Sequence, residues 1–281
     1  MCPLESYSGH MPTHGEIAQS FGLDAERYDR TRPRYPAAMV DRITAALPGR
    51  SILDVGTGTG IAARQFRAAG CRVLGVEPDE RMAAVARRHG IDVETAAFEQ
   101  WDPAGRTFDG VTAGQTWHWV DPLAGAEQAA RVLPRGGRLA LFWNTFNAGP
   151  EVTEMFAEAY RRAAPNLPFS PWSKPTPSSP DKNDKSDLSN EKSPGGLDPF
   201  HDRAADGIRR SGRFGEPGLW TFEWEHTYTR GEWLDLVPTS GGHNLLPAGE
   251  LETLLHHIGD AIGDTVTIGY RTVVTVAELA G

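Results

Sequence analysis

Short apolar runs alternate with helix-compatible stretches between residues 51 and 143. Strands are predicted over residues 51–55, 72–76, 91–94, 108–113 and 138–143. Between them, residues 61–69, 79–88 and 123–133 carry Ala, Leu, Arg and Met at helical spacing. This alternation is typical of βαβ units around a parallel sheet. The first two runs are apolar on both faces, as in strands that helices cover on each side.

The flanking segments predict further elements of the same domain. Residues 16–46 suggest two helices, and Pro33 and Pro36 prevent one continuous helix. Residues 222–229 and 265–276 resemble strands on either side of a helix at about 247–262. We therefore expect an α/β fold: a doubly wound, mostly parallel sheet, completed by a late antiparallel hairpin and preceded by a helical N-terminal cap.

The organisation of the chain follows from these elements. We expect a cap over 1–50, a ligand-binding α/β core over 51–165, an insertion over 166–205, and a completion of the same domain over 206–281. Within the insertion, residues 171–197 are rich in Ser, Pro, Lys and Asp and poor in large apolar residues. Such a segment buries too little apolar surface to offset the entropy of ordering, so we expect it to be disordered or mobile.

Composition narrows the class of partner. The 281 residues carry a net charge of −9, which argues against a nucleic-acid partner. The only two cysteines, Cys2 and Cys71, make a native disulfide improbable. The sequence shows neither a signal-peptide pattern nor an apolar run of membrane-spanning length, so we expect a cytoplasmic protein without a membrane partner.

The most informative motif is the run Leu-Asp-Val-Gly-Thr-Gly-Thr-Gly over residues 53–60, which ends the first strand and opens the first helix. Glycines at 56, 58 and 60 let the backbone turn sharply and approach a ligand. The free N–H groups of the helix start can serve an anionic group. Glu77 ends the second strand, where a carboxylate can accept both hydroxyls of a ribose.

A dinucleotide-binding protein would show similar features. Counting from Gly56 puts Ile61 at the third glycine of the Gly-x-Gly-x-x-Gly fingerprint, which is a mismatch. Counting from Gly58 puts Ala63 there, which the looser form permits. A nicotinamide-dependent oxidoreductase therefore stays open, as does a glycine-rich turn that only connects a strand to a helix.

Five motifs in order resemble class I S-adenosylmethionine-dependent methyltransferases, and most closely the type 11 small-molecule group that includes trans-aconitate methyltransferases. They are the glycine-rich run, the acidic end of residues 73–78, residues 97–99, the Gln-x-x-His-Trp-x-Asp stretch at 115–121, and residues 133–144. The resemblance implies methyl transfer from S-adenosylmethionine to a small-molecule acceptor, leaving S-adenosylhomocysteine. It leaves open whether oxygen, nitrogen, carbon or a carboxylate is methylated, and a non-catalytic protein that binds the cofactor remains an alternative.

The resemblance also implies roles for single residues. Gly56, Thr57 and Gly58 would lie along the methionine part of the cofactor, Asp54 would brace that loop, and Glu77 would hold the ribose. The remaining implied cofactor contacts are Gly60, Pro78, Met82, Ala97, Phe98 and Gln115. Many relatives carry Asp where this chain has Ala97, so adenine recognition would rest on the backbone there. Glu99 would contact the ligand or brace its own loop.

The candidate catalytic residue is His118, which follows the fourth strand at the edge where open α/β sheets bind ligands. It would accept a proton from a hydroxyl acceptor or contact the substrate, whereas a carboxylate acceptor needs no base. A purely structural histidine is the alternative. Candidate substrate contacts are Tyr28, Arg32, Trp117, Trp119 and His243. No cluster has metal-site spacing, so we expect no metal. The oligomeric state stays open.

Overall fold

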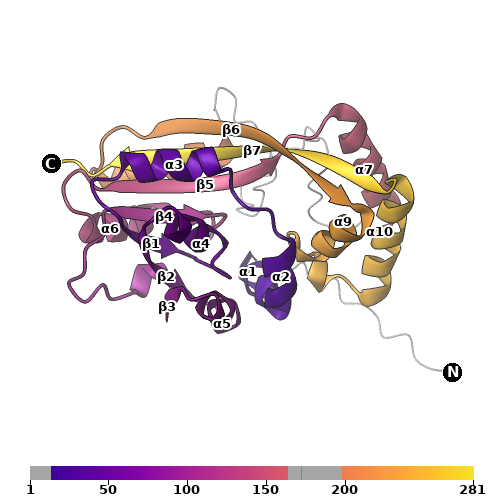
Figure 1. Ribbon diagram of the computed structural model, residues 1–281, viewed down its shortest axis with the longest axis horizontal. Helices are drawn as coiled ribbons and strands as arrows, with labels where there is room; N and C mark the ends of the chain where they lie inside the picture. Colours follow the sequence, from indigo (N-terminus) through magenta and orange to yellow (C-terminus); the bar gives the residue numbers. More distant parts are fainter. Residues whose placement is uncertain (1–13, 164–171, 173–197) are drawn as a thin grey trace.

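A seven-stranded sheet forms the centre of the protein (Figure 1). The computed structural model describes residues 14–163, 172 and 198–281. The strand order is β3-β2-β1-β4-β5-β7-β6. Five strands run parallel: β1 (Ser51–Val55), β2 (Arg72–Glu77), β3 (Asp92–Thr95), β4 (Gly110–Gly114) and β5 (Arg138–Phe146). Because β7 (Thr265–Glu278) is antiparallel to both β5 and β6 (Gly218–Thr229), the predicted mostly parallel sheet with a late antiparallel pair is confirmed.

Helices cover both faces of this sheet. The connecting helices are α4 (Ile61–Ala68), α5 (Glu80–Arg88) and α6 (Pro122–Val132). Successive residues of β1 point to opposite faces, so Leu53 joins an apolar cluster with Trp143, and Ile52 joins one with Phe66. Both β1 side chains are fully buried, which contributes about 1.5–3 kcal/mol each. Cys71 packs in the second cluster as a free thiol.

The N-terminal part forms the predicted helical cap. It contains α1 (His14–Ser20), the 3-10 turn η1 (Phe21–Asp24), α2 (Ala25–Thr31) and, after the break at 32–36, α3 (Ala37–Ala46). The first predicted helix is divided because the Asp24 side chain accepts the Arg27 N–H and starts a new helix. From α2, Asp29 pairs with Arg64 of α4, and Arg27 pairs with Asp235. The cap therefore bridges the glycine-rich half of the protein and the C-terminal half.

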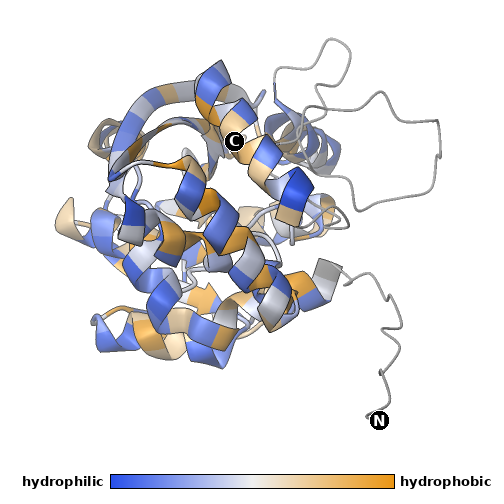
Figure 2. Cartoon of the chain, turned by 90° about the vertical axis from the view of Figure 1, so that its right-hand side faces the viewer, coloured by the Kyte–Doolittle hydropathy of each residue, from blue (hydrophilic) through white to orange (hydrophobic). Residues whose placement is uncertain are grey.

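A group of helices lies beyond the end of β6 and the start of β7, at the right of Figure 1. This side of the protein faces the viewer in Figure 2. The group consists of α7 (Pro150–Ala163), α9 (Arg230–Leu236) and α10 (Ala248–Ala261), with the 3-10 turns η3 (Val237–Thr239) and η4 (His243–Leu245) beside them. Their apolar faces meet in a cluster around Phe156, Trp233 and Leu254. The helix α10 was predicted, whereas α7 and α9 were not. Within the described ranges, no helix is long and apolar enough to cross a membrane.

The predicted insertion ends too late in the sequence. Helix α8 (Pro199–Ser211) begins where Asp198 accepts the backbone N–H groups of Phe200 and His201. Ala204 and Ile208 recur at helical spacing and so lie on one face of α8. Both are buried in the main core. The disorder or mobility expected for the insertion over 166–205 is therefore wrong for residues 199–205, which are helical. Of residues 171–197, for which disorder is predicted, the structure describes only residue 172. Cys2 also lies outside the described residues.

Candidate functional site

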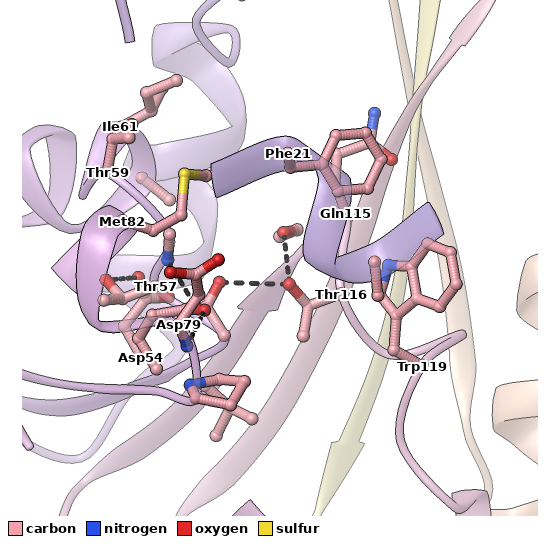
Figure 3. Close-up of a pocket in the computed structure, with 18 of the residues that line it drawn as sticks. Phe21, Asp54, Thr57, Thr59, Ile61, Asp79, Met82, Gln115, Thr116 and Trp119 are labelled. Atoms are coloured by element: carbon pink, nitrogen blue, oxygen red, sulfur yellow. Dashed lines mark hydrogen bonds between the residues drawn. The ribbon is translucent and has the colours of Figure 1, made fainter. Parts of the chain in front are cut away.

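A cavity of about 760 Å³ opens at the carboxyl ends of the parallel strands (Figure 3). Its wall includes the ends of β1, β2 and β4 and the segments that follow them. In the sheet, β1 lies between β2 and β4, so the connections around it leave in opposite directions. Open α/β sheets bind ligands at this kind of switch point. The volume is typical of small-molecule sites.

The glycine-rich turn forms one wall of this cavity. Gly56 and Gly58 have φ values of 58° and 56°, which only glycine adopts at no cost. The Gly56 N–H donates to the carbonyl of Val76 on β2 at 2.8 Å. A Cβ at residue 56 would lie 2.1 Å from Cγ2 of Thr116. The turn therefore needs glycine for its backbone angles and for its close approach to the opposite wall.

Asp54 connects this turn to the neighbouring strands through two hydrogen bonds. Asp54 on β1 stands beside Thr112 on β4 in the strand register, and its Oδ1 accepts the Thr112 hydroxyl at 2.7 Å. Its Oδ2 accepts the Thr57 hydroxyl at 2.7 Å. Burial raises the pKa of Asp54 to about 6, although both hydroxyls favour the ionised form. The carboxyl group thus ties β1, β4 and the turn together.

Glu77 presents a nearly buried carboxylate at the end of β2. Its Oε2 accepts the N–H of Gly58 at 2.9 Å, and its Oε1 accepts the N–H of Asp79 at 3.0 Å. Burial raises its pKa to about 7, against the effect of these two backbone donors. Each oxygen keeps lone-pair capacity for a further donor. The group is therefore placed to accept two hydroxyl groups of a ligand in the cavity.

Four further predicted cofactor contacts line the cavity. They are Pro78, Met82, Ala97 and Phe98, with Met82 coming from α5 and Phe98 from the 3-10 turn η2 (Phe98–Gln100). Glu99 also reaches the wall, but its Oε1 accepts the Asp121 N–H at 3.1 Å. Of the two roles expected for Glu99, the loop-bracing one is therefore present.

The segment after β4 forms the opposite wall, with Gln115, Thr116, His118 and Trp119. Gln115 has φ 55°, an unfavourable value for a residue with a side chain. Two hydrogen bonds hold it there: its N–H donates to the carbonyl of Phe142, and its Nε2 donates to that of Asn144. Such strain is characteristic of functional sites.

The cap and the C-terminal half complete the cavity. Tyr28 and Arg32, two of the predicted substrate contacts, line it beside Phe21, whose ring contacts those of Tyr28 and Trp119. The lining residues that the sequence reasoning missed include Thr116, Asn144 and Phe200. Asn144 could have been found, because it lies near the carboxyl end of the fifth predicted strand.

Three predicted site residues do not line the cavity. Gly60, with φ 83°, starts α4, and a Cβ there would lie 3.2 Å from Cβ of Ala86, so it serves helix packing. Trp117 is 2% exposed and packs against Phe98 in the core. His243 is fully buried at the start of η4, where its ring nitrogens contact the Tyr160 hydroxyl of α7 and the Ser240 carbonyl. Its predicted contact with substrate is wrong because no part of it reaches the cavity.

The buried His243 gives a stability prediction. Burial lowers its pKa to about 4, whereas the unfolded chain binds the proton near pH 6.5. This histidine therefore contributes stability above pH 6.5 that is lost as the pH falls towards 4, about 3 kcal/mol in total. Burial raises the pKa of Asp54 and of Glu77. The stability that these two groups contribute is therefore lost as the pH rises, which is the opposite of the effect of His243.

Comparison with His243→Gln isolates this effect. Urea denaturation at several pH values should show the wild type losing its stability advantage over His243→Gln as the pH falls from about 6.5 to 4. His256 provides the control, because its side chain is 71% exposed and its pair with Asp260 is a surface pair, so His256→Gln should differ from the wild type far less than His243→Gln does over the same pH range. A constant difference between wild type and His243→Gln would contradict the buried neutral imidazole.

Comparison with known proteins places this cavity in a family. A family described as methyltransferase domains matches residues 28–174, more than half of the chain, and the chain belongs to it. An uncharacterized methyltransferase of Mycobacterium tuberculosis is 37% identical over 134 residues, 46% of this chain and 54% of that relative. The chain thus spans about half the length of the curated relatives it matches. Membership favours a methyltransferase over a nicotinamide-dependent oxidoreductase, whereas the trans-aconitate branch stays a prediction.

Two solved structures share the fold. A candidate type II methyltransferase from Anaeromyxobacter dehalogenans has a TM-score of 0.60 at 20% identity, covering 89% of this chain and 99% of that one. The phosphoethanolamine N-methyltransferase 2 of Haemonchus contortus, solved with phosphomonomethylethanolamine and S-adenosylhomocysteine, has a TM-score of 0.51 at 14% identity. That match covers 96% of this chain and 61% of the nematode enzyme. At these identities the likeness concerns the fold.

Proposed function

We propose that this protein transfers a methyl group from S-adenosylmethionine to a small-molecule acceptor in the cavity. The observation that carries the proposal is Glu77, whose two oxygens are anchored by backbone N–H groups beside the glycine-rich turn of a methyltransferase domain. A carboxylate held in this way suits the two hydroxyls of a ribose. The neighbour from Haemonchus contortus, which was solved with S-adenosylhomocysteine, supports this choice of cofactor.

The cavity offers a matching contact for each part of that cofactor. Glu77 would accept the ribose hydroxyls, and the turn at Gly56 and Gly58 would admit the methionine part without Cβ interference. Met82 and Phe98 would supply apolar surface for adenine, and Gln115 would face the methionine end. Glu77 ends β2, and Gln115 directly follows β4. These two strands are two steps apart in the sheet, so their ends lie about 10 Å from each other.

In the proposed reaction, the bound sulfonium supplies an electrophilic methyl group. The protein holds the acceptor in line with that group, which converts an encounter of two molecules into a step within one complex. The aromatic side chains of Phe21, Tyr28 and Trp119 line the cavity in contact with one another and would exclude water from the bound reactants. His118 lies on the wall beside them and would contact the acceptor.

We extend the proposal to partner and location. The acceptor would be a small molecule, because the cavity wall includes the cap as well as the sheet edge. The net charge of −9 makes a nucleic-acid partner unfavourable. A cytoplasmic location remains a prediction from the sequence. Within the described residues, no group of three or more His, Cys, Asp or Glu side chains is placed to hold a metal ion.

A labelled-methyl experiment tests the transfer itself. The full chain, incubated with methyl-labelled S-adenosylmethionine and a metabolite extract of the source organism, should label a small molecule and release S-adenosylhomocysteine in equal amount. Glu77→Ala, at the same concentration, should give far less label. Cofactor binding without any labelled product would identify a non-catalytic binding protein instead.

A further inference from the structure

Five of the aromatic side chains on the cavity wall form one continuous row. In order, this aromatic row consists of Tyr28, Phe21, Trp119, His118 and Phe200. The ring centre of Phe21 lies 5.8 Å from that of Tyr28 and 6.2 Å from that of Trp119. The His118 ring lies 4.6 Å from Trp119 and 5.5 Å from Phe200. All five side chains are only partly buried, so the row keeps apolar surface that a ligand in the cavity can cover.

The far end of the row rests on the buried side chain of Trp143. The ring of Phe200, at the start of α8, stacks on Trp143 with 5.4 Å between the centres and 14° between the planes. The Trp143 indole N–H also donates to Nδ1 of His118 at 3.2 Å. An indole nitrogen only donates, so the neutral imidazole carries its proton on Nε2. Because Trp143 is 1% exposed, it holds both rings in place.

The row extends from the proposed cofactor end of the cavity to its other side. Phe21 packs against the apolar cluster that contains Met82. Trp119 follows β4 and Phe200 lies against β5, whereas the glycine-rich turn follows β1. In Figure 3, Trp119 and Thr57 of that turn lie on opposite sides of the cavity. The cavity of about 760 Å³ is more than twice as large as the smallest small-molecule sites, about 300 Å³, so it has room for an acceptor beside a cofactor.

We propose that the methyl acceptor carries an aromatic ring, which binds against Phe21, Trp119 and Phe200. Partly exposed rings lose contact with water when a ligand covers them, and this stabilises the complex. Aromatic pairs that meet offset or edge to face attract each other beyond this effect. The rings of the row are tilted against one another by 46° to 68°, so they offer both faces and edges to a planar ligand. This inference rests on the proposed function and names its substrate class.

A cation is the other kind of ligand that aromatic faces attract. At the cap end of the row, however, the Arg32 guanidinium already lies 5.0 Å from the ring centre of Tyr28. The sulfonium of the proposed cofactor would bring a second positive charge into the same cavity. Because like charges repel, both disfavour a cationic acceptor. A neutral aromatic ring is therefore the acceptor group that this wall suits best.

Two matched alcohols test the inference. Benzyl alcohol and cyclohexylmethanol have the same carbon skeleton and the same hydroxyl group, but only the first is aromatic. Calorimetry first records S-adenosylhomocysteine binding to the protein, and each alcohol is then titrated into the saturated protein. We expect benzyl alcohol to bind with a millimolar dissociation constant, since so small a ligand makes few contacts. It should bind about twofold to tenfold more tightly than cyclohexylmethanol, and more tightly than tetramethylammonium chloride.

Leucine variants show whether the row makes this contact. Trp119→Leu and Phe200→Leu keep an apolar side chain but remove a ring, so the two alcohols should bind with about equal affinity. Trp220→Leu is the matched control, because Trp220 is a partly buried ring outside the cavity wall, under the Arg42 guanidinium. This variant should keep the wild-type ratio of the two affinities. The affinity of each variant for S-adenosylhomocysteine shows that the cofactor end is intact.

The outcomes separate this inference from the proposed function. Absence of S-adenosylhomocysteine binding to the wild type overturns the proposed function itself. If that ligand binds, the aromatic acceptor alone is overturned by any of three results. Benzyl alcohol does not bind or binds no more tightly than cyclohexylmethanol; tetramethylammonium binds more tightly than benzyl alcohol; or Trp119→Leu and Phe200→Leu both keep the ratio seen in Trp220→Leu.

Discussion

Asp54→Ala is expected to lower the free energy of unfolding by about 3 kcal/mol and to weaken cofactor binding. The substitution leaves the hydroxyls of Thr57 and Thr112 without their acceptor in a buried place. Loss of the contact with Thr57 also frees the glycine-rich turn, so the variant must order that turn again when the ligand binds.

Asp54→Asn is the matched control for this prediction. The asparagine keeps the size of the side chain and one oxygen acceptor, and its NH₂ can donate to the other hydroxyl. We expect it to lose about 1 kcal/mol. Urea denaturation gives both unfolding free energies, and calorimetry with S-adenosylhomocysteine gives both affinities. An alanine variant as stable as the asparagine variant would show that Asp54 does not brace the turn.

Glu77→Ala is expected to weaken S-adenosylhomocysteine binding by about tenfold to a hundredfold, the worth of a charged two-oxygen contact. Wild-type affinity should also depend on pH. The ribose hydroxyls would donate to the ionised carboxylate, and burial raises the pKa of Glu77 to about 7. Binding thus favours loss of the proton, so affinity should fall as the pH drops from about 8 to 6 and approach a tenfold loss per pH unit well below the pKa.

Two variants separate charge from fold in this test. Glu77→Gln cannot ionise, so its affinity should be lower than that of the wild type at pH 8 and should lack this pH dependence. Glu94→Gln is the control, because Glu94 pairs with Arg106 outside the cavity wall. Calorimetry of all four proteins over the pH range gives the comparison. Unchanged affinity in a folded Glu77→Ala would mean that the ribose binds elsewhere.

The local sequence pattern was enough to predict the elements around the glycine-rich turn. The predicted range 51–55 matches β1, and the turn that follows needs positive φ values at the glycines of the motif. In α8, by contrast, the helical spacing of Phe200, Ala204 and Ile208 follows directly on a Ser- and Pro-rich segment. Because of that composition, the predicted insertion extends to residue 205, into the first half of this helix.

The orientation of the side chains on the opposite wall of the cavity depends on contacts between residues far apart in the sequence, which no local sequence pattern contains. Asn144 is oriented by Thr272, which is 128 residues away and meets it only through the antiparallel register of β5 and β7. Trp117 and Trp119 lie two residues apart in one turn, yet the first enters the core and the second faces the cavity. The sequence suggested a base at His118, whereas the indole of Trp143 favours a donor.

Calorimetric titration of S-adenosylhomocysteine into the 281-residue chain is the most direct test of the central claim. We expect one molecule to bind per chain, with an affinity that decreases in Glu77→Ala, and no competition from NAD or NADP. No heat of binding with either S-adenosylhomocysteine or S-adenosylmethionine at millimolar concentration, from protein shown to be folded, would contradict the account.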